Sequence, residues 1–134
     1  MKHSGIVIIG AGPAGIRAAQ TLVAYGLQPC LIDESLRGGG QVYRRQPENF
    51  TRSAKALYGF EASKAQAVHS TLDRLRPDID YRPQTLVWNA EAQTLDTLHD
   101  GVAAQLPYTH LIVATGCPTS RLWTATIPVI AKTD

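Results

Sequence analysis

Three glycines and one acidic residue near the start of the chain have the types and spacing that suit binding of a dinucleotide. Gly10, Gly12 and Gly15 form the pattern GxGxxG, and Asp33 ends the next apolar run. In such a pattern the first glycine permits a tight turn, and the second lets the backbone approach a pyrophosphate. The third allows a helix to pack closely on a strand.

The elements around this pattern are those that a dinucleotide site requires. Gly5–Ile9 is a short apolar, β-branched run, which predicts a strand buried on both faces in a parallel sheet. Apolar residues at helical spacing predict a helix over Pro13–Tyr25, and Gly26 ends it. Pro29–Asp33 predicts a second buried strand. Strand, helix and strand together predict a right-handed βαβ unit.

The beginning of the predicted helix supplies the groups that would hold phosphate. Pro13 suits the first helical turn, where its missing N–H is not needed. The N–H groups around Ala14 would face the ligand together with the positive end of the helix dipole. GxGxxG alone is a weak signal, but a preceding strand, a following helix and a later acid make it strong.

The acidic residue is predicted to hold the ribose. A carboxylate at Asp33 would accept hydrogen bonds from both ribose hydroxyls and would repel a 2′-phosphate, which argues against NADP. Glu34 is the competing candidate if the strand register shifts by one residue. This local geometry serves NAD and FAD equally, so the choice between them depends on later segments.

The rest of the chain predicts a loop, a helical stretch and several short strands. Ser35–Asn49 is rich in glycine and polar residues, and Ala54–Leu75 is mostly helical by composition, with a break near Tyr58-Gly59. We expect Gly5–Ile9, Pro29–Asp33 and His110–Ala114 to lie side by side in a parallel sheet, with an antiparallel meander from Thr85 to Leu106 packed on it. The other candidate strands are Ile79–Arg82, Thr85–Ala90, Thr94–Leu98 and Ala103–Leu106, with a hairpin turn at His99-Asp100-Gly101.

Length and composition exclude several other classes of protein. A chain of 134 residues suits one domain, and 44% hydrophobic with 18% charged residues indicates a folded rather than a disordered one. The net charge of +2 does not suggest nucleic-acid binding, and no apolar run is long enough for a membrane span. Cys30 and Cys117 form neither a CxxC nor a metal-ligand set, so we expect no metal site and a reducing, cytoplasmic location.

Several segments resemble a known group of flavoproteins. Gly39-Gly40-Gln41, following Pro29–Asp33, resembles the FAD domain of thioredoxin reductase-like proteins, as does Glu48-Asn49-Phe50. The fuller run from Gly39 to Pro47 resembles the FAD subunit of opine oxidases, hydrogen cyanide synthase and related amino-acid dehydrogenases. The resemblance covers residues 5–116. Three further segments share it, namely Leu57-Tyr58-Gly59, Tyr81-Arg82-Pro83 and Leu86-Val87-Trp88.

The resemblance implies FAD as the cofactor and further residues that contact it. In the family, the loop matching Gly40 and Gln41 lies along the flavin. The strand matching Val87 meets the adenine through backbone groups, and a segment matching Ala114-Thr115-Gly116 passes near the cofactor. The implied fold is an α/β, Rossmann-like FAD-binding domain with a parallel sheet and a small antiparallel β-meander.

The chain also departs from that family. It has no redox-active cysteine pair, no second GxGxxG, and not the later Gly-Asp segment that completes the family's FAD domain. We therefore expect a partial FAD/NAD(P)-binding domain over residues 1–121, truncated at its C-terminus, and a divergent tail over residues 122–134.

The expected function is that of the FAD-binding part of an oxidoreductase. It would transfer hydride from an opine or amino acid to flavin, with other oxidoreductase subunits as possible partners. The alternatives are a non-catalytic dinucleotide-binding fragment and an inactive remnant. No catalytic residue is assigned, since none of the scattered histidines His3, His69, His99 and His110 stands out as a base.

Overall fold

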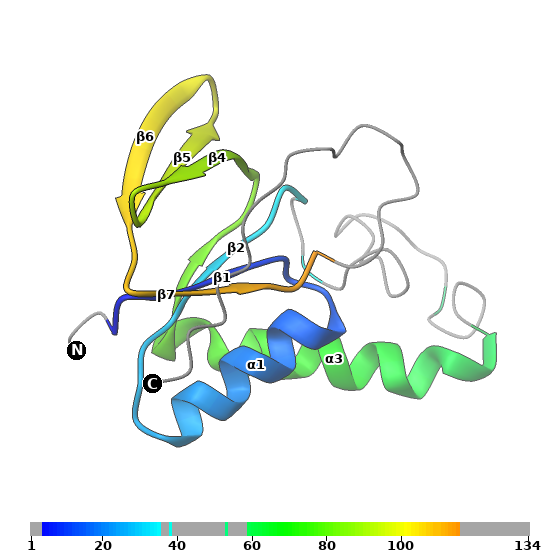
Figure 1. Ribbon diagram of the computed structural model, residues 1–134. Helices are drawn as coiled ribbons and strands as arrows, with labels where there is room; N and C mark the ends of the chain where they lie inside the picture. Colours follow the sequence, from blue (N-terminus) through cyan, green and yellow to red (C-terminus); the bar gives the residue numbers. More distant parts are fainter. Residues whose placement is uncertain (1–3, 36–37, 39–52, 54–58, 116–134) are drawn as a thin grey trace.

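The domain is built of three layers around a parallel β-sheet (Figure 1). The computed structural model describes residues 4–35, 38, 53 and 59–115, and the structural statements below concern these residues. A four-stranded sheet forms the middle layer, a three-stranded antiparallel sheet lies on one of its faces, and two helices cover the other. This arrangement confirms the predicted fold class.

The middle layer contains strands β1 (Ile6–Ile9), β2 (Cys30–Ile32), β3 (Asp80–Arg82) and β7 (His110–Val113). They pair in parallel in the order β3-β2-β1-β7. The three strands expected to lie side by side therefore do so, with β1 between the other two. β3 extends the sheet beyond β2, a position that the sequence pattern did not indicate.

The helical layer consists of α1 (Pro13–Ala24) and α3 (Ala62–Leu75), flanked by the short 3-10 helices η1 (Gly59–Glu61) and η2 (Arg76–Asp78). α1 ends within one residue of its predicted boundary, and Gly26 follows it with a φ of +80°. The helices pack on the sheet through one apolar core, whose members include Ile8, Leu31, Ile16, Ala19, Val68 and Leu72. Of the predicted helical stretch, residues 54–58 lie outside the described residues.

The antiparallel sheet is the predicted meander, made of β4 (Thr85–Glu91), β5 (Thr94–His99) and β6 (Val102–Pro107). Asp100 and Gly101 form the predicted hairpin turn, both with positive φ. Val87 and Leu95 point toward the parallel sheet and form a second core with Val7, Ile9, Cys30 and Ile32. The register shifts between Val87 and Asn89, and Trp88 at this bulge is 56% exposed. Each face of the parallel sheet thus has its own apolar core.

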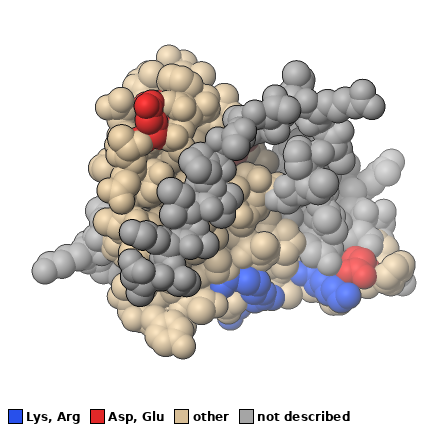
Figure 2. All heavy atoms as spheres, viewed as in Figure 1, with Lys and Arg blue, Asp and Glu red and all other residues tan. Residues whose placement is uncertain are grey.

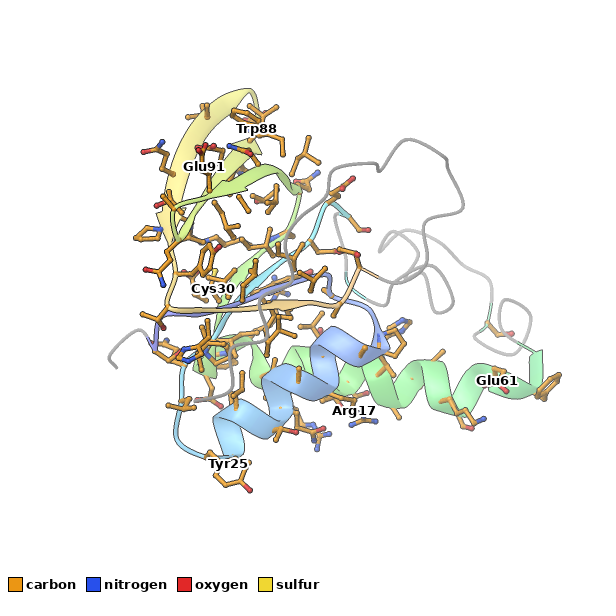
Figure 3. All side chains as sticks on the ribbon, in the orientation of Figure 1. Arg17, Tyr25, Cys30, Glu61, Trp88 and Glu91 are labelled. Atoms are coloured by element: carbon orange, nitrogen blue, oxygen red, sulfur yellow. The ribbon has the colours of Figure 1, made fainter. Side chains whose placement is uncertain are left out.

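Cys30 is buried in that second core, between the sheet and the meander (Figure 3). Its register partner in β3 is Asp80, whose carboxylate also accepts two hydrogen bonds from Arg82, of 3.1 Å and 3.0 Å. Burial and the negative charge of Asp80 raise the pKa of the Cys30 thiol from 9.0 to about 12. The thiol is therefore neutral at physiological pH, which agrees with a packing role.

We predict that Cys30 reacts very slowly with thiol reagents while the chain is folded. At pH values below 9.0, a pKa of about 12 lowers the thiolate fraction roughly a thousandfold. Because the folded pKa is raised, this thiol also contributes stability below pH 9.0 that is lost as the pH rises toward about 12. The measurement is the rate of dithionitrobenzoate reaction in a Cys117→Ser background, folded and in urea. Equal rates would show that Cys30 is accessible and ionised.

Candidate dinucleotide-binding site

Three segments that are distant in the sequence meet at the carboxyl end of the parallel sheet. Ile9 is in register with Ile32 on one side and with Val113 on the other, so β1, β2 and β7 end at the same level (Figure 1). The Gly10 N–H donates to the Ile32 carbonyl at 2.7 Å, and the Ala114 N–H donates to the Ile9 carbonyl at 2.8 Å. Ligands of open parallel sheets bind at this edge.

The first and third glycines of the pattern are required by the packing around them. Gly10 has a φ of +107°, and a Cβ on it would lie 2.5 Å from the carbonyl oxygen of Ala114. A Cβ on Gly15 would overlap the carbonyl oxygen of Gly10, because α1 begins directly on the end of β1. The tight turn and the close helix–strand packing expected from the sequence are therefore both present.

Among the described residues, no side chain caps the backbone donors at the N-terminus of α1. Gly12 is the N-cap residue, Pro13 begins the helix, and the first turn carries no acidic residue. The first hydrogen bond of the helix runs from the Ile16 N–H to the Gly12 carbonyl at 3.0 Å. The N–H groups of Ala14 and Gly15 precede this bond, so the helix itself supplies them with no acceptor. An anion such as a diphosphate is the ligand that this arrangement favours.

The one basic side chain of α1 is engaged on the helical layer. Arg17, the basic residue of α1, donates to Gln20 at 2.8 Å and to Thr71 of α3 at 3.4 Å. On the face shown in Figure 2, the described Lys and Arg side chains lie over the helical layer, and an acidic side chain lies on the meander. Among the described groups at the turn, the backbone N–H groups of α1 are therefore the ones suited to meet an anion.

Asp33 directly follows β2 and faces the glycine turn. Its Oδ1 accepts a hydrogen bond from the Ala11 N–H at 3.2 Å, and its Oδ2 accepts one from the Ser35 N–H at 3.3 Å. The side chain is half-buried, whereas Glu34 is exposed. Of the two acids that the sequence left as alternatives, Asp33 is thus the one whose carboxylate lies beside the turn.

The backbone of Asp33 is fixed by the strand that enters the meander. The Asp33 N–H donates to the Arg82 carbonyl at 3.1 Å, and the Thr85 N–H donates to the Asp33 carbonyl at 2.9 Å. Gln84, whose φ is +50°, donates its N–H to the Ser35 carbonyl at 3.0 Å. Sequence analysis missed these three backbone hydrogen bonds, and no signal in the sequence of residues 82–85 indicates them.

Of the remaining predicted site residues, the structure describes Ala114, Thr115 and Val87. Ala114 is half-buried beside Gly10, and Thr115 is exposed at the same edge of the sheet. Val87 is 4% exposed and its side chain lies in the core, so that side chain is not available to a ligand. Gly40, Gln41 and Gly116 lie outside the described residues.

One glycine that sequence analysis did not select lies against the site. Gly38 is buried, and its nearest neighbours are Leu72 of α3 and Ala11 of the glycine turn. The run of three glycines from Gly38 to Gly40 was the available signal, but only its last two members match the resemblance.

Among the described residues, no three His, Cys, Asp or Glu side chains lie close enough together to hold a metal ion.

A comparison with family models identifies the family of this chain. The model described as pyridine nucleotide-disulphide oxidoreductase matches residues 4–132. The chain belongs to this family. Membership confirms the resemblance inferred from the sequence and indicates a dinucleotide cofactor, FAD or a relative of it. No helix among the described residues is long and apolar enough to cross a membrane.

Several individual proteins are similar to parts of this chain. An opine oxidase subunit of Rhizobium meliloti is 36% identical over 88 residues, covering 66% of this chain and 16% of that protein. Hydrogen cyanide synthase subunit HcnB of Pseudomonas protegens is 34% identical over 113 residues, covering 83% and 24%. Among solved structures, L-proline dehydrogenase from P. horikoshii superimposes with a TM-score of 0.61 at 22% identity, covering 83% and 22%. The chain therefore spans less than a quarter of the length of these proteins.

Proposed function

We propose that this domain binds FAD and forms the cofactor-binding part of a flavin-dependent oxidoreductase. The observation that carries the proposal is the meeting of the α1 N-terminus, the glycine turn and the Asp33 carboxylate at one edge of the sheet. An anion-binding helix terminus and a fixed carboxylate are the two groups that recognise the diphosphate and the ribose of a dinucleotide.

Each residue of the site has a role that follows from its position. The N–H groups at the start of α1 would hold the diphosphate, and Gly12 would leave room for it. The Asp33 carboxylate already accepts one N–H on each oxygen, and its remaining lone pairs would accept the ribose hydroxyls. The resemblance assigns Gly40, Gln41, the Val87 backbone and Ala114-Thr115-Gly116 to the rest of the cofactor. When bound, the flavin supplies the hydride acceptor.

The names of related proteins favour a nitrogen-containing substrate for the complete enzyme. They include subunits of an opine oxidase and of a hydrogen cyanide synthase and, by fold, an L-proline dehydrogenase. We therefore propose an opine or amino acid as the hydride donor and further oxidoreductase subunits as partners. A cytoplasmic location is part of the same proposal, because Cys30 is a free thiol in the core and reducing compartments preserve such thiols.

The proposal is tested first by replacing the two neighbouring acids. Asp33→Ala should weaken FAD binding by about 1.5–3 kcal/mol, the usual contribution of hydrogen bonds to a charged group. Glu34→Ala, which removes an exposed carboxylate one residue away, should leave the affinity within about twofold, as surface substitutions usually do. The measurement is calorimetric or fluorescence titration of FAD into the 134-residue chain and both variants.

Two results would count against the proposal. If the unsubstituted chain bound neither FAD nor ADP, the site would not be a dinucleotide site. If Glu34→Ala lost affinity and Asp33→Ala did not, the ribose would lie on the other acid. Reduction of a dye by the complete protein with an added opine or proline tests the oxidoreductase step separately, and failure with all such substrates would reject the proposed substrate class.

A further inference from the structure

Strand β6 forms an open edge of the meander (Figure 1). The antiparallel sheet has the order β4-β5-β6, and within the described residues no strand pairs with the outer side of β6. Its residues are exposed except for the half-buried Leu106, and Val102 is 66% exposed. None of its side chains is charged. Folded proteins usually protect a sheet edge with charges, bulges or a covering element, so an uncharged edge of this length is suited to pairing with another strand.

The hairpin turn decides which backbone groups of β6 face this open edge. Asp100-Gly101 is a two-residue turn, so His99 and Val102 are register partners. In such a turn the second partner donates its N–H to the carbonyl of the first, so the Val102 N–H points toward β5. Backbone groups alternate in direction along a strand, and the N–H and C=O groups of Ala103 and Gln105 therefore face outward.

The side chains of β6 divide between the two faces of the meander. Leu106 is the register partner of the buried Leu95 and packs against the second core. Val102 and Ala104 lie four and two residues before Leu106, so they point to the same face as Leu106 does. Pro107 ends the strand, and a proline suits a position whose N–H would face away from β5. The part of β6 that can pair on its outer side is therefore short and ends at this proline.

We propose that β6 pairs with β6 of a second copy of this chain, antiparallel and with Ala104 opposite Ala104. In this register Ala103 lies opposite Gln105 of the second copy, and these two residues exchange hydrogen bonds in both directions. The twofold axis repeats the pair, which gives about four backbone hydrogen bonds between the copies. The same register brings the exposed Val102 side chain beside Leu106 of the second copy, on the same face of the extended sheet.

The strand is complementary to itself, which identifies a second copy as the partner. Neither edge carries a charge, so two copies approach without like-charge repulsion. The side chain of Gln105 is held on its own sheet, where Nε2 donates to Asp96 Oδ1 at 3.3 Å. Val102, an exposed apolar residue in one copy, gains an apolar neighbour in the dimer. The inference is independent of the proposed function, because β6 contributes no residue to the dinucleotide site.

The test places charges where the two strands meet on the twofold axis. Ala104→Lys and Ala104→Glu each set two like charges opposite one another in the dimer, whereas in a single chain this position is exposed. Each variant should weaken dimerisation at least about tenfold. An equimolar mixture of the two variants should associate again, because lysine then lies opposite glutamate. Sedimentation equilibrium of the 134-residue chain over a wide range of concentration measures the dissociation constants.

A control variant and a second measurement separate this edge from other surfaces. Glu91→Lys changes an exposed charge on β4, at the other edge of the same sheet, and should leave dimerisation within about twofold. Hydrogen exchange of the unsubstituted chain requires no variant to fold. The amide protons of Ala103 and Gln105 should exchange more slowly as the protein concentration rises, because they become hydrogen-bonded in the dimer.

Several results would overturn the inference. A chain that stays monomeric at every concentration has no such contact. A dimer that persists in both Ala104 variants lies on another surface, as does one whose formation leaves the exchange of Ala103 and Gln105 unchanged. Two weakened variants that fail to associate when mixed contradict the proposed register. Growth beyond a dimer also contradicts it, because a twofold contact closes after two copies.

Discussion

Gly15→Ala should destabilise the domain by about 3 kcal/mol or prevent it from folding, as severe overpacking against backbone does. Two effects oppose one another at this position. Alanine is favoured over glycine inside a helix by about 1 kcal/mol, which alone would stabilise α1. The new Cβ, however, would overlap the carbonyl oxygen of Gly10, and that residue is held by a 2.7 Å hydrogen bond to Ile32 and by its contact with Ala114. The steric effect is therefore expected to win.

The measurement is urea unfolding followed by circular dichroism, which gives the free energy of unfolding. Ala14→Gly is the matched control, because Ala14 is the exposed neighbour in the same helical turn. It should cost at most about 1 kcal/mol, the propensity difference alone. A Gly15→Ala variant as stable as the unsubstituted chain would mean that α1 does not pack on the end of β1 as described.

Gly12→Val should lower the affinity for FAD and ADP at least about a hundredfold while the domain stays folded, since a branched side chain at the N-cap would stand where the diphosphate approaches. Gly12 has a φ of −82° and a ψ of −174°, which is extended backbone that any residue adopts. The substitution therefore introduces bulk at the site without straining the turn. This distinguishes Gly12 from Gly10 and Gly15, whose replacement affects folding itself.

Titration of ADP and a thermal unfolding curve decide the outcome for Gly12. The expected result is a large loss of affinity with an unfolding midpoint within about 5 °C of the unsubstituted chain, a shift of at most about 1 kcal/mol. Gly12→Ala should give an intermediate affinity. Unchanged binding in Gly12→Val would show that the diphosphate does not lie over this turn, and a lost fold would show that Gly12 is needed for packing.

The sequence by itself determined the central βαβ unit and the glycine turn within it. Its signals are local: the apolar run of Gly5–Ile9, the helical spacing after Pro13 and the glycines between them lie within one short stretch. The hairpin at Asp100-Gly101 was equally predictable, because such a turn needs positive φ and this residue pair supplies it. Such features depend on residues that are close together in the chain, so they can be predicted from the sequence alone.

Only the tertiary structure decided which residues from distant segments meet at the site. β3 is a three-residue strand with two charged members and no apolar alternation, so nothing local assigns it to β2. Its pairing nevertheless holds the backbone of Asp33, whose carboxylate lies beside the glycine turn. The space at Gly38 likewise exists only because Leu72 and Ala11 are brought together from α3 and the glycine turn. Steric room and long-range pairing arise from packing, and packing depends on residues that are far apart along the chain.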